Sequence, residues 1–218
     1  MISLSNVTKM YGEKIKVLAL NNVSLQVDRG EFVSIMGPSG SGKTTLLNII
    51  GCLDKPTEGK YILDGKEIDR LSRSELSELR GREMGFVFQS FNLIPTLTAL
   101  ENVELPLYLT DRPDRERCLK LLNDVRLSGL EGRRPDELSA GQQQRVAIAR
   151  ALANNPEIIL GDEITGNMDS KTGEEIMDLL KELNRGEDKT IIIVTHNASM
   201  AYGRIVRIED GRINEPCS

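Results

Sequence analysis

Short apolar runs alternate with stretches of helical periodicity along most of the chain. The apolar runs are too short for helices, and they predict strands at 31–36, 84–88, 158–161 and 191–194. Residues 22–27 are also expected to form a strand, joined to 31–36 by Asp28-Arg29-Gly30, among the antiparallel strands of the N-terminal region. Helices are expected from about 141 to 154 and over the segment that carries Ile176, Leu179, Leu180 and Leu183. Alternation of this kind is typical of an α/β protein with a mostly parallel sheet.

The N-terminal region has a different pattern, which predicts antiparallel strands beside that sheet. Asp64-Gly65 follows the apolar residues of 61–63, and an Asp-Gly pair in this position favours a tight hairpin turn. Ser72 and Glu75 have the spacing of a capping box and predict a short helix over 72–80. Gly81 is expected to end this helix.

Between Phe91 and Leu138 the pattern becomes mostly helical. Apolar side chains occur there at spacings i, i+3, i+4 and i+7, which places them on one face of an amphipathic helix: Cys118, Leu121, Leu122 and Val125. We therefore expect a helical insert, roughly residues 91–140, that interrupts the α/β core.

Composition narrows the class of protein. A chain of 218 residues can form one large domain with a sizeable core. Its net charge is −5, with 28 basic against 33 acidic residues, which disfavours a nucleic-acid partner. Cys52, Cys118 and Cys217 have unrelated spacings, so no disulfide framework is expected and a reducing compartment is favoured.

Membrane contact is expected to depend on a partner. The first residues lack the charged and apolar regions of a signal peptide, and no apolar run approaches the roughly 20 residues that span a bilayer. These features predict a cytoplasmic protein.

The segment after the 31–36 strand carries the most specific chemistry. It reads G-P-S-G-S-G-K-T, the phosphate-loop pattern in its required place between a strand and a helix. Glycines let consecutive backbone N–H groups point at a polyphosphate, and the helix N-terminus adds its dipole. The residues expected to bind nucleotide are Gly37, Pro38, Ser39, Gly40, Ser41, Gly42, Lys43, Thr44 and Thr45. A glycine turn with an accidental lysine is the alternative, and the context disfavours it.

Polar residues of suitable chemistry end the other predicted parallel strands. Gln89 follows Phe88, Asp162 and Glu163 follow Gly161, and His196 lies two residues beyond Val194. Ligands of open α/β sheets bind beyond the carboxyl ends of strands, so these side chains should meet at one site. Asp162 can hold Mg²⁺, and Glu163 is a candidate general base for water that attacks the γ-phosphate.

His196 is the only histidine of the chain. A lone histidine is usually a surface or core residue, but at this sheet edge a hydrogen bond to the γ-phosphate or the attacking water is favoured. Gln89 taken alone would be an ordinary loop residue.

A second motif, L-S-A-G-Q-Q-Q-R, covers residues 138–145. Ser139 and Gln142 can form a capping box at the start of a helix, and this alone would be an ordinary structural feature. A helix N-terminus with a serine and Gly141 is also an anion site. Because residues 37–44 already hold the phosphates of their own chain, this second site suggests the nucleotide of another subunit.

In order and type, these motifs resemble those of the ATP-binding cassette (ABC) ATPases, and the resemblance spans essentially the whole chain. The finer similarity is to the small cassettes of lipoprotein-release, macrolide-export and antimicrobial-peptide systems; it lies in segments 51–59, 91–95 and 100–103. The resemblance implies a P-loop NTPase (RecA-like) core with a mostly parallel sheet, an N-terminal antiparallel β subdomain and the helical insert. Residues 1–218 would then be a single nucleotide-binding domain.

The resemblance also implies roles for single residues. Two copies would pack head to tail around two ATP molecules. Tyr11 would stack on adenine, and Thr44, Gln89 and Asp162 would serve Mg²⁺. Glu163 would polarise the water, with Gln89 and His196 in the catalytic site. The residues implied to act on the partner's nucleotide are Ser139, Ala140, Gly141, Gln142 and Asp169.

Several positions depart from the family pattern. Ala140 replaces the first glycine of the usual Leu-Ser-Gly-Gly-Gln, and a positive φ at that position would cost about 1 kcal/mol for alanine. Ile164 stands where the branch usually has proline, and Gly161 replaces a larger apolar residue. Asn197 follows the histidine where aspartate is common.

The function that follows is an ATPase that drives a separate integral membrane permease, to which it binds at the inner face of the membrane. The permease contact is expected near Gln89, at Phe91, Leu93, Ile94, Pro95 and Leu97, which could instead be core residues of the insert.

The first alternative to this function is a regulatory ATPase of the cell-division type, which shares these motifs. The second alternative is a soluble ABC ATPase, but such proteins usually have two cassettes or a coiled coil in one chain. The third is a nucleotide-binding module without hydrolysis, which would not need Glu163.

Overall fold

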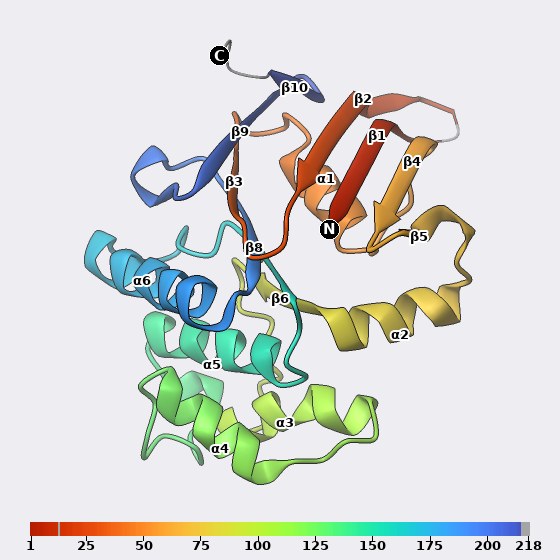
Figure 1. Ribbon diagram of the computed structural model, residues 1–218. Helices are drawn as coiled ribbons and strands as arrows, with labels where there is room; N and C mark the ends of the chain where they lie inside the picture. The colour runs from red at the N-terminus through yellow and green to blue at the C-terminus, as the bar shows by residue number, and fades with distance from the viewer. Residues whose placement is uncertain (13, 215–218) are drawn as a thin grey trace.

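Two β-sheets and a group of helices make up the computed structural model, which describes residues 1–12 and 14–214 (Figure 1). The strands are β1 (Ile2–Tyr11), β2 (Val17–Val27), β3 (Phe32–Met36), β4 (Glu58–Leu63), β5 (Lys66–Glu67), β6 (Met84–Phe88), β7 (Ile158–Asp162), β8 (Thr190–Thr195), β9 (Arg204–Glu209) and β10 (Arg212–Asn214). The α-helices are α1 (Lys43–Ile50), α2 (Arg73–Glu83), α3 (Ala99–Leu109), α4 (Arg115–Asp124), α5 (Ala140–Leu152) and α6 (Ser170–Glu187). Short 3₁₀ helices cover η1 (Ile68–Arg70), η2 (Pro135–Glu137) and η3 (Ala198–Met200).

The larger sheet has six strands in the order β10-β9-β3-β8-β7-β6. All neighbouring pairs are parallel except β10 and β9, which confirms the mostly parallel sheet. The carboxyl ends of β3, β6, β7 and β8 therefore face the same edge, as the sequence predicts. Strands β9 and β10 were not predicted, because β9 exposes alternate residues and lacks a continuous apolar run.

The smaller sheet is antiparallel, in the order β2-β1-β4-β5. Strands β4 and β5 form the predicted hairpin, in which Leu63 pairs with Lys66. Asp64 and Gly65 have φ of 46° and 78°, and a type I′ turn needs positive φ at both positions. The structure confirms the N-terminal antiparallel region and adds β1, whose many polar residues hid it in the sequence.

One predicted helix end is wrong. Ser72 and Glu75 form the expected capping box at the start of α2, but the helix passes through Gly81 and ends at Glu83. Gly81 has no positive φ, and a Cβ at this position would touch only Thr110 Cγ2 at 3.4 Å. The helix ends instead where the chain extends into β6, since the backbone of Met84 is already extended.

Two apolar clusters hold these layers together. One lies between the two sheets around α1 and includes Leu46 and Ile50. The other joins the opposite face of the large sheet to α3, α4, α5 and α6. Cys118, Leu122 and Val125 are buried in it and Leu121 is partly buried, which confirms the predicted face.

Helices α3 and α4 lie at the end of the molecule away from the antiparallel sheet (Figure 1). Helix α5 packs against both α3 and β6, so it connects the helical region to the α/β core. Within the described residues no helix is long and apolar enough to cross a membrane. Cys52 and Cys118 are free and buried, and Cys217 lies outside the described residues.

Candidate functional site

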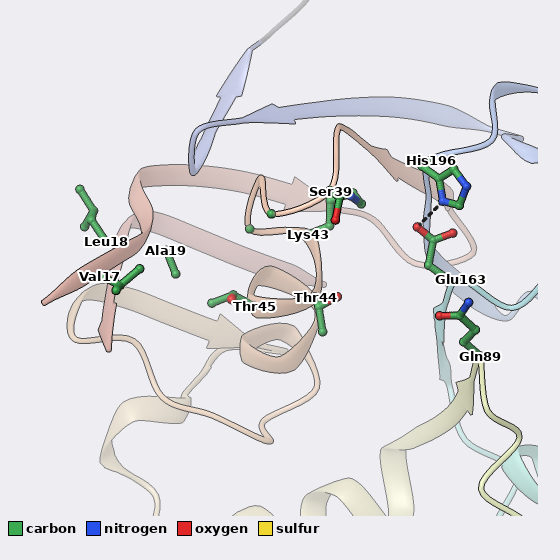
Figure 2. A pocket seen from close by; sticks show the side chains of 12 residues that line it. Val17, Leu18, Ala19, Ser39, Lys43, Thr44, Thr45, Gln89, Glu163 and His196 are labelled. Carbon is green, nitrogen blue, oxygen red and sulfur yellow. Dashed lines mark hydrogen bonds and ion pairs between the residues drawn. The ribbon is translucent and has the colours of Figure 1, made fainter. Parts of the chain in front are cut away.

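A cavity of about 610 Å³ lies at the carboxyl edge of the parallel sheet (Figure 2). Most of its lining comes from the segments in which the sequence predicts nucleotide-binding and catalytic residues. The lining residues are Val17, Leu18, Ala19, Ser39, Gly40, Gly42, Lys43, Thr44, Thr45, Gln89, Glu163 and His196. The structure thus brings the phosphate loop, Gln89, Glu163 and His196 together.

The phosphate loop curls around the Lys43 ammonium. Lys43 Nζ donates to the carbonyls of Gly37 at 2.9 Å and Pro38 at 2.7 Å. A Cβ on Gly37 would come within 2.0 Å of the Ile208 carbonyl oxygen, so only glycine fits there. Gly42 precedes α1 with φ of 102° and offers no side-chain cap, which leaves the first N–H groups of α1 available for an anion.

Asp162 ends β7 next to the start of α1. Its Oδ1 lies 3.4 Å from Thr44 Oγ1. Burial raises the pKa of Asp162, and the hydrogen bond from Thr44 opposes that rise. A hydroxyl and a carboxylate are oxygen ligands of the type that Mg²⁺ prefers, with substrate phosphates and water to complete its coordination. This donor set fits the metal that the sequence predicts.

Glu163 and His196 form a pair across the ends of β7 and β8. His196 Nδ1 lies 2.9 Å from Glu163 Oε1, and Figure 2 shows the two side chains facing each other. The carboxylate is 17% exposed and the imidazole 65% exposed, so the histidine lies on the solvent side. The carboxylate therefore remains accessible to water while its direction is set by the imidazole.

Gln89 is exposed directly after β6, on the lining of the cavity. Its backbone carbonyl accepts a hydrogen bond from Asn167 Nδ2 at 3.0 Å. This bond connects the loop after β6 to the loop after β7. The side chain lies near Glu163 in Figure 2, at the edge of the site.

The second motif lies outside this cavity. Ser139 Oγ accepts from the backbone of Gln142 at 3.3 Å, and Gln142 Oε1 accepts from the backbone of Ser139 at 2.9 Å, which confirms the capping box. Asp169 similarly caps α6 by accepting from Thr172 N at 3.0 Å. Ser139, Ala140, Gly141, Gln142 and Asp169 are all outside the cavity lining.

Ala140 carries no backbone strain. It is the first residue of α5, and its φ is not positive. The cost of about 1 kcal/mol that alanine would have with a positive φ at this position therefore does not arise.

Tyr11 lies on β1 beside the cavity but is not part of its lining. Its hydroxyl donates to Asp54 Oδ2 at 2.8 Å, and Lys9 Nζ lies 4.9 Å from its ring centroid. Burial and Asp54 raise the pKa of Tyr11. The backbone of Tyr11 pairs in register with Val17, which does line the cavity.

Sequence reasoning missed Val17, Leu18 and Ala19 as lining residues. Their only signal is that Val17 and Leu18 are apolar residues at the exposed start of β2. The sequence of one strand does not show which of its side chains are exposed. The apolar lining beside the phosphate loop could therefore be identified only from the fold.

The parallel sheet with a phosphate loop at its carboxyl edge places the chain among the P-loop nucleoside triphosphatases. Residues 20–166 match the family described as ABC transporter. The ABC transporter ATP-binding protein MJ0796 of Methanocaldococcus jannaschii is 57% identical over 224 residues, covering 98% of this chain and 95% of MJ0796. The chain belongs to the ABC transporter family and is an ATPase of that family.

Two further comparisons extend this result. The macrolide export ATP-binding/permease protein MacB of Syntrophobacter fumaroxidans is 50% identical over 98% of this chain, which matches 31% of MacB. A solved dimeric structure of MJ0796 in a post-hydrolysis state, bound to ADP and Pi, superposes with a TM-score of 0.91 at 53% identity. That alignment covers 99% of this chain and 97% of the MJ0796 chain.

Proposed function

We propose that this chain is the ATP-hydrolysing subunit of a membrane transporter of the lipoprotein-release, macrolide or peptide efflux type. Two copies sandwich two ATP molecules head to tail and drive a separate integral membrane permease from its cytoplasmic side. Residues 1–218 act as one nucleotide-binding domain, with 91–140 as its helical subdomain. The observation that carries this proposal is the Glu163–His196 pair at 2.9 Å beside the phosphate loop.

Within one chain, each part of the site has its own role. Residues 37–45 hold the phosphates, and Tyr11 stacks on adenine. Thr44, Gln89 and Asp162 would hold Mg²⁺, which would supply positive charge to offset that of the phosphates. Glu163 orients and deprotonates the water, and His196 holds the carboxylate and contacts the γ-phosphate. Catalysis is then mainly positioning and electrostatic stabilisation.

The second half of each site comes from the other copy. Ser139, Ala140, Gly141 and Gln142 form an exposed or half-exposed helix start outside their own chain's cavity. A helix N-terminus suits a γ-phosphate, and a head-to-tail pair would bring it to the partner's nucleotide. Asp169 lies at the start of the neighbouring α6 and would help to couple the two sites. The solved structures of MJ0796 are dimeric, which supports a pair of cassettes.

The permease contact lies beside Gln89. An apolar cavity of about 270 Å³ opens between the α/β core and the helical region, lined by residues that include Phe88, Asn92, Pro106 and Arg150. Of the residues that the sequence proposes for this contact, Leu93 packs against the core, whereas Ile94 and Pro95 are exposed. Phe91, Ile94, Pro95 and Leu97 remain candidates for the contact.

The proposal is tested by capture of the partner. Tagged Glu163→Gln protein with ATP should retain from native membranes a permease with few spans and a large extracytoplasmic domain. Phe91→Asp in the same background should reduce that capture at least about tenfold, because it places a charge in an apolar contact. Aspartate tolerates the left-handed backbone of Phe91, at φ of 58°, so the loop should be preserved.

Ile205→Asp is the matched control, since Ile205 is an exposed apolar residue on β9 away from this contact. Basal ATPase should stay within about twofold in otherwise wild-type Phe91→Asp protein. Equal capture by the two aspartate variants would remove Phe91 from the contact. Recovery of only soluble partners in repeated trials would count against the transporter function.

Tyr11 supports a separate prediction. Tyr11→Ala should raise the Kd for ATP about tenfold or more, because base–aromatic stacking contributes about 1–3 kcal/mol. Titration with ATP and with a base-free ribose triphosphate separates the two parts of the ligand. Only ATP affinity should fall. An equal loss for both ligands would show that Tyr11 supports the phosphate loop rather than the base.

A further inference from the structure

The backbone of Glu163 has an uncommon conformation. Its φ is 49°, in the left-handed region that a residue with a Cβ rarely adopts. Such conformations persist where the surrounding structure determines them. Two bonds hold the residue directly: its N–H donates to the Val194 carbonyl at 3.0 Å, and its carbonyl accepts from Gly166 N at 2.9 Å.

The next residue, Ile164, is held from a different direction. Its carbonyl accepts a hydrogen bond of 2.9 Å from Gln144 Nε2. Gln144 is fully buried and lies in α5, the helix that begins at Ala140 directly after Ser139. Ile164 itself is only 3% exposed. A side chain of α5 thus holds the peptide between Ile164 and Thr165, one residue beyond the catalytic carboxylate.

Gly161 makes room for Ile164 on the other side. A Cβ on Gly161 would come within 2.9 Å of Ile164 Cγ2 and 3.1 Å of Ile193 Cγ2. Because Ile164 is β-branched, its Cγ2 methyl cannot swing away without a change of rotamer. The two departures from the family pattern near Glu163 therefore fit each other: a glycine in β7 accommodates an isoleucine after the glutamate.

Packing alone does not explain the amide of Gln144. Its Oε1 is buried and has no hydrogen-bond partner among the described residues. A buried acceptor without a partner opposes stability, so an apolar side chain of similar shape would fill this space at least as well. We therefore attribute the hydrogen bond to Ile164 to the positioning of the loop after β7, and not to the stability of the fold.

We propose that Gln144 and Gly161 are positioning residues that keep the Glu163 carboxylate beside His196. Gln144 acts through the Ile164 carbonyl, and Gly161 acts through the Ile164 side chain. The inference rests on the proposed role of Glu163 as the residue that activates water. It also means that α5, whose first turn serves the partner's nucleotide, holds the catalytic carboxylate of its own chain.

Gln144→Met is the first test, because methionine is unbranched, of similar length and unable to hold the carbonyl. We expect kcat to fall about 10- to 100-fold, as for a catalytic group misplaced by about 1 Å. The KM for ATP and ATP-dependent dimerisation in a Glu163→Gln background should be unchanged. The melting temperature should change little, since the variant leaves the Ile164 carbonyl without its donor but also removes the unpaired Oε1 of Gln144.

Asn102→Leu is the matched control. Asn102 is also fully buried in a helix and holds backbone carbonyls, those of Ile94, Leu97 and Thr98, but it lies outside the nucleotide site. This control should lower the melting temperature and leave kcat unchanged at a temperature where the protein is folded. An unchanged kcat in Gln144→Met, or a loss that only follows the folded fraction, would overturn the inference.

The second test uses rescue. Gly161→Ala should lower kcat, and Ile164→Ala in the same chain should restore most of it, because the closer clash, with Ile164 Cγ2, is then removed and only the approach to Ile193 Cγ2 at 3.1 Å remains. A double variant no more active than Gly161→Ala would overturn the role of Gly161. Failure of the proposed function is seen separately: if Glu163→Gln itself retains wild-type turnover, Glu163 is not the catalytic base, whatever the positioning variants do.

Discussion

Replacement of Glu163 by glutamine should reduce steady-state ATP turnover by about 10²–10⁴-fold, the usual contribution of general acid–base catalysis. The amide keeps the shape of the carboxylate and can still meet His196, but it cannot accept a proton from water. Lys43 and the phosphate loop are untouched, so ATP should still bind. With binding intact and hydrolysis blocked, an ATP-bound dimer should accumulate.

Size-exclusion chromatography with and without ATP tests this prediction together with phosphate release. Glu174→Gln is a suitable control, because Glu174 is an exposed carboxylate on α6 outside the cavity. It should turn over ATP at the wild-type rate and should show no trapped dimer. A Glu163→Gln protein that stays monomeric at high concentration and saturating ATP would count against the composite site.

Much of this site could be predicted because its signals are local. The strand β6 has the predicted limits, since a short apolar run is bounded there by polar residues. The meeting of Gln89, Glu163 and His196 needed only one general rule, that parallel strands bring their carboxyl ends to one edge. The two capping boxes of α2 and α5 were read from pairs three residues apart.

What the sequence could not show depends on contacts between distant segments. Gln144 and Ile164 are separated by 20 residues, and nothing in either local pattern indicates that an amide of one meets a carbonyl of the other. The role of Gly161 could not be predicted for the same reason, because its close neighbour Ile193 comes from another strand. Gly81 is a different case. The local rule that a glycine ends a helix predicted the wrong end for α2, because the helix continues to the point where β6 begins.

The strongest test of the shared site uses two inactive variants. One disrupts the phosphate loop, and the other disrupts the helix start that the partner contributes to the site. Lys43→Met removes the buried ammonium from the phosphate loop while keeping an apolar stem in its place. Ser139→Asp keeps a good N-cap for α5 but would place a negative charge against the partner's γ-phosphate in the dimer that we propose. Each variant alone should have turnover about 10²-fold below wild type, because every site in its dimer has one faulty half.

An equal mixture of the two variants should recover activity. About half of the dimers formed at random are mixed, and each mixed dimer has one site built from an intact phosphate loop and an intact helix start, so about a quarter of wild-type turnover is expected. If the helix start served its own chain, every site in the mixture would keep a fault and activity would stay at the average of the two variants. Recovery therefore requires that Ser139 of one copy act on the nucleotide held by Lys43 of the other.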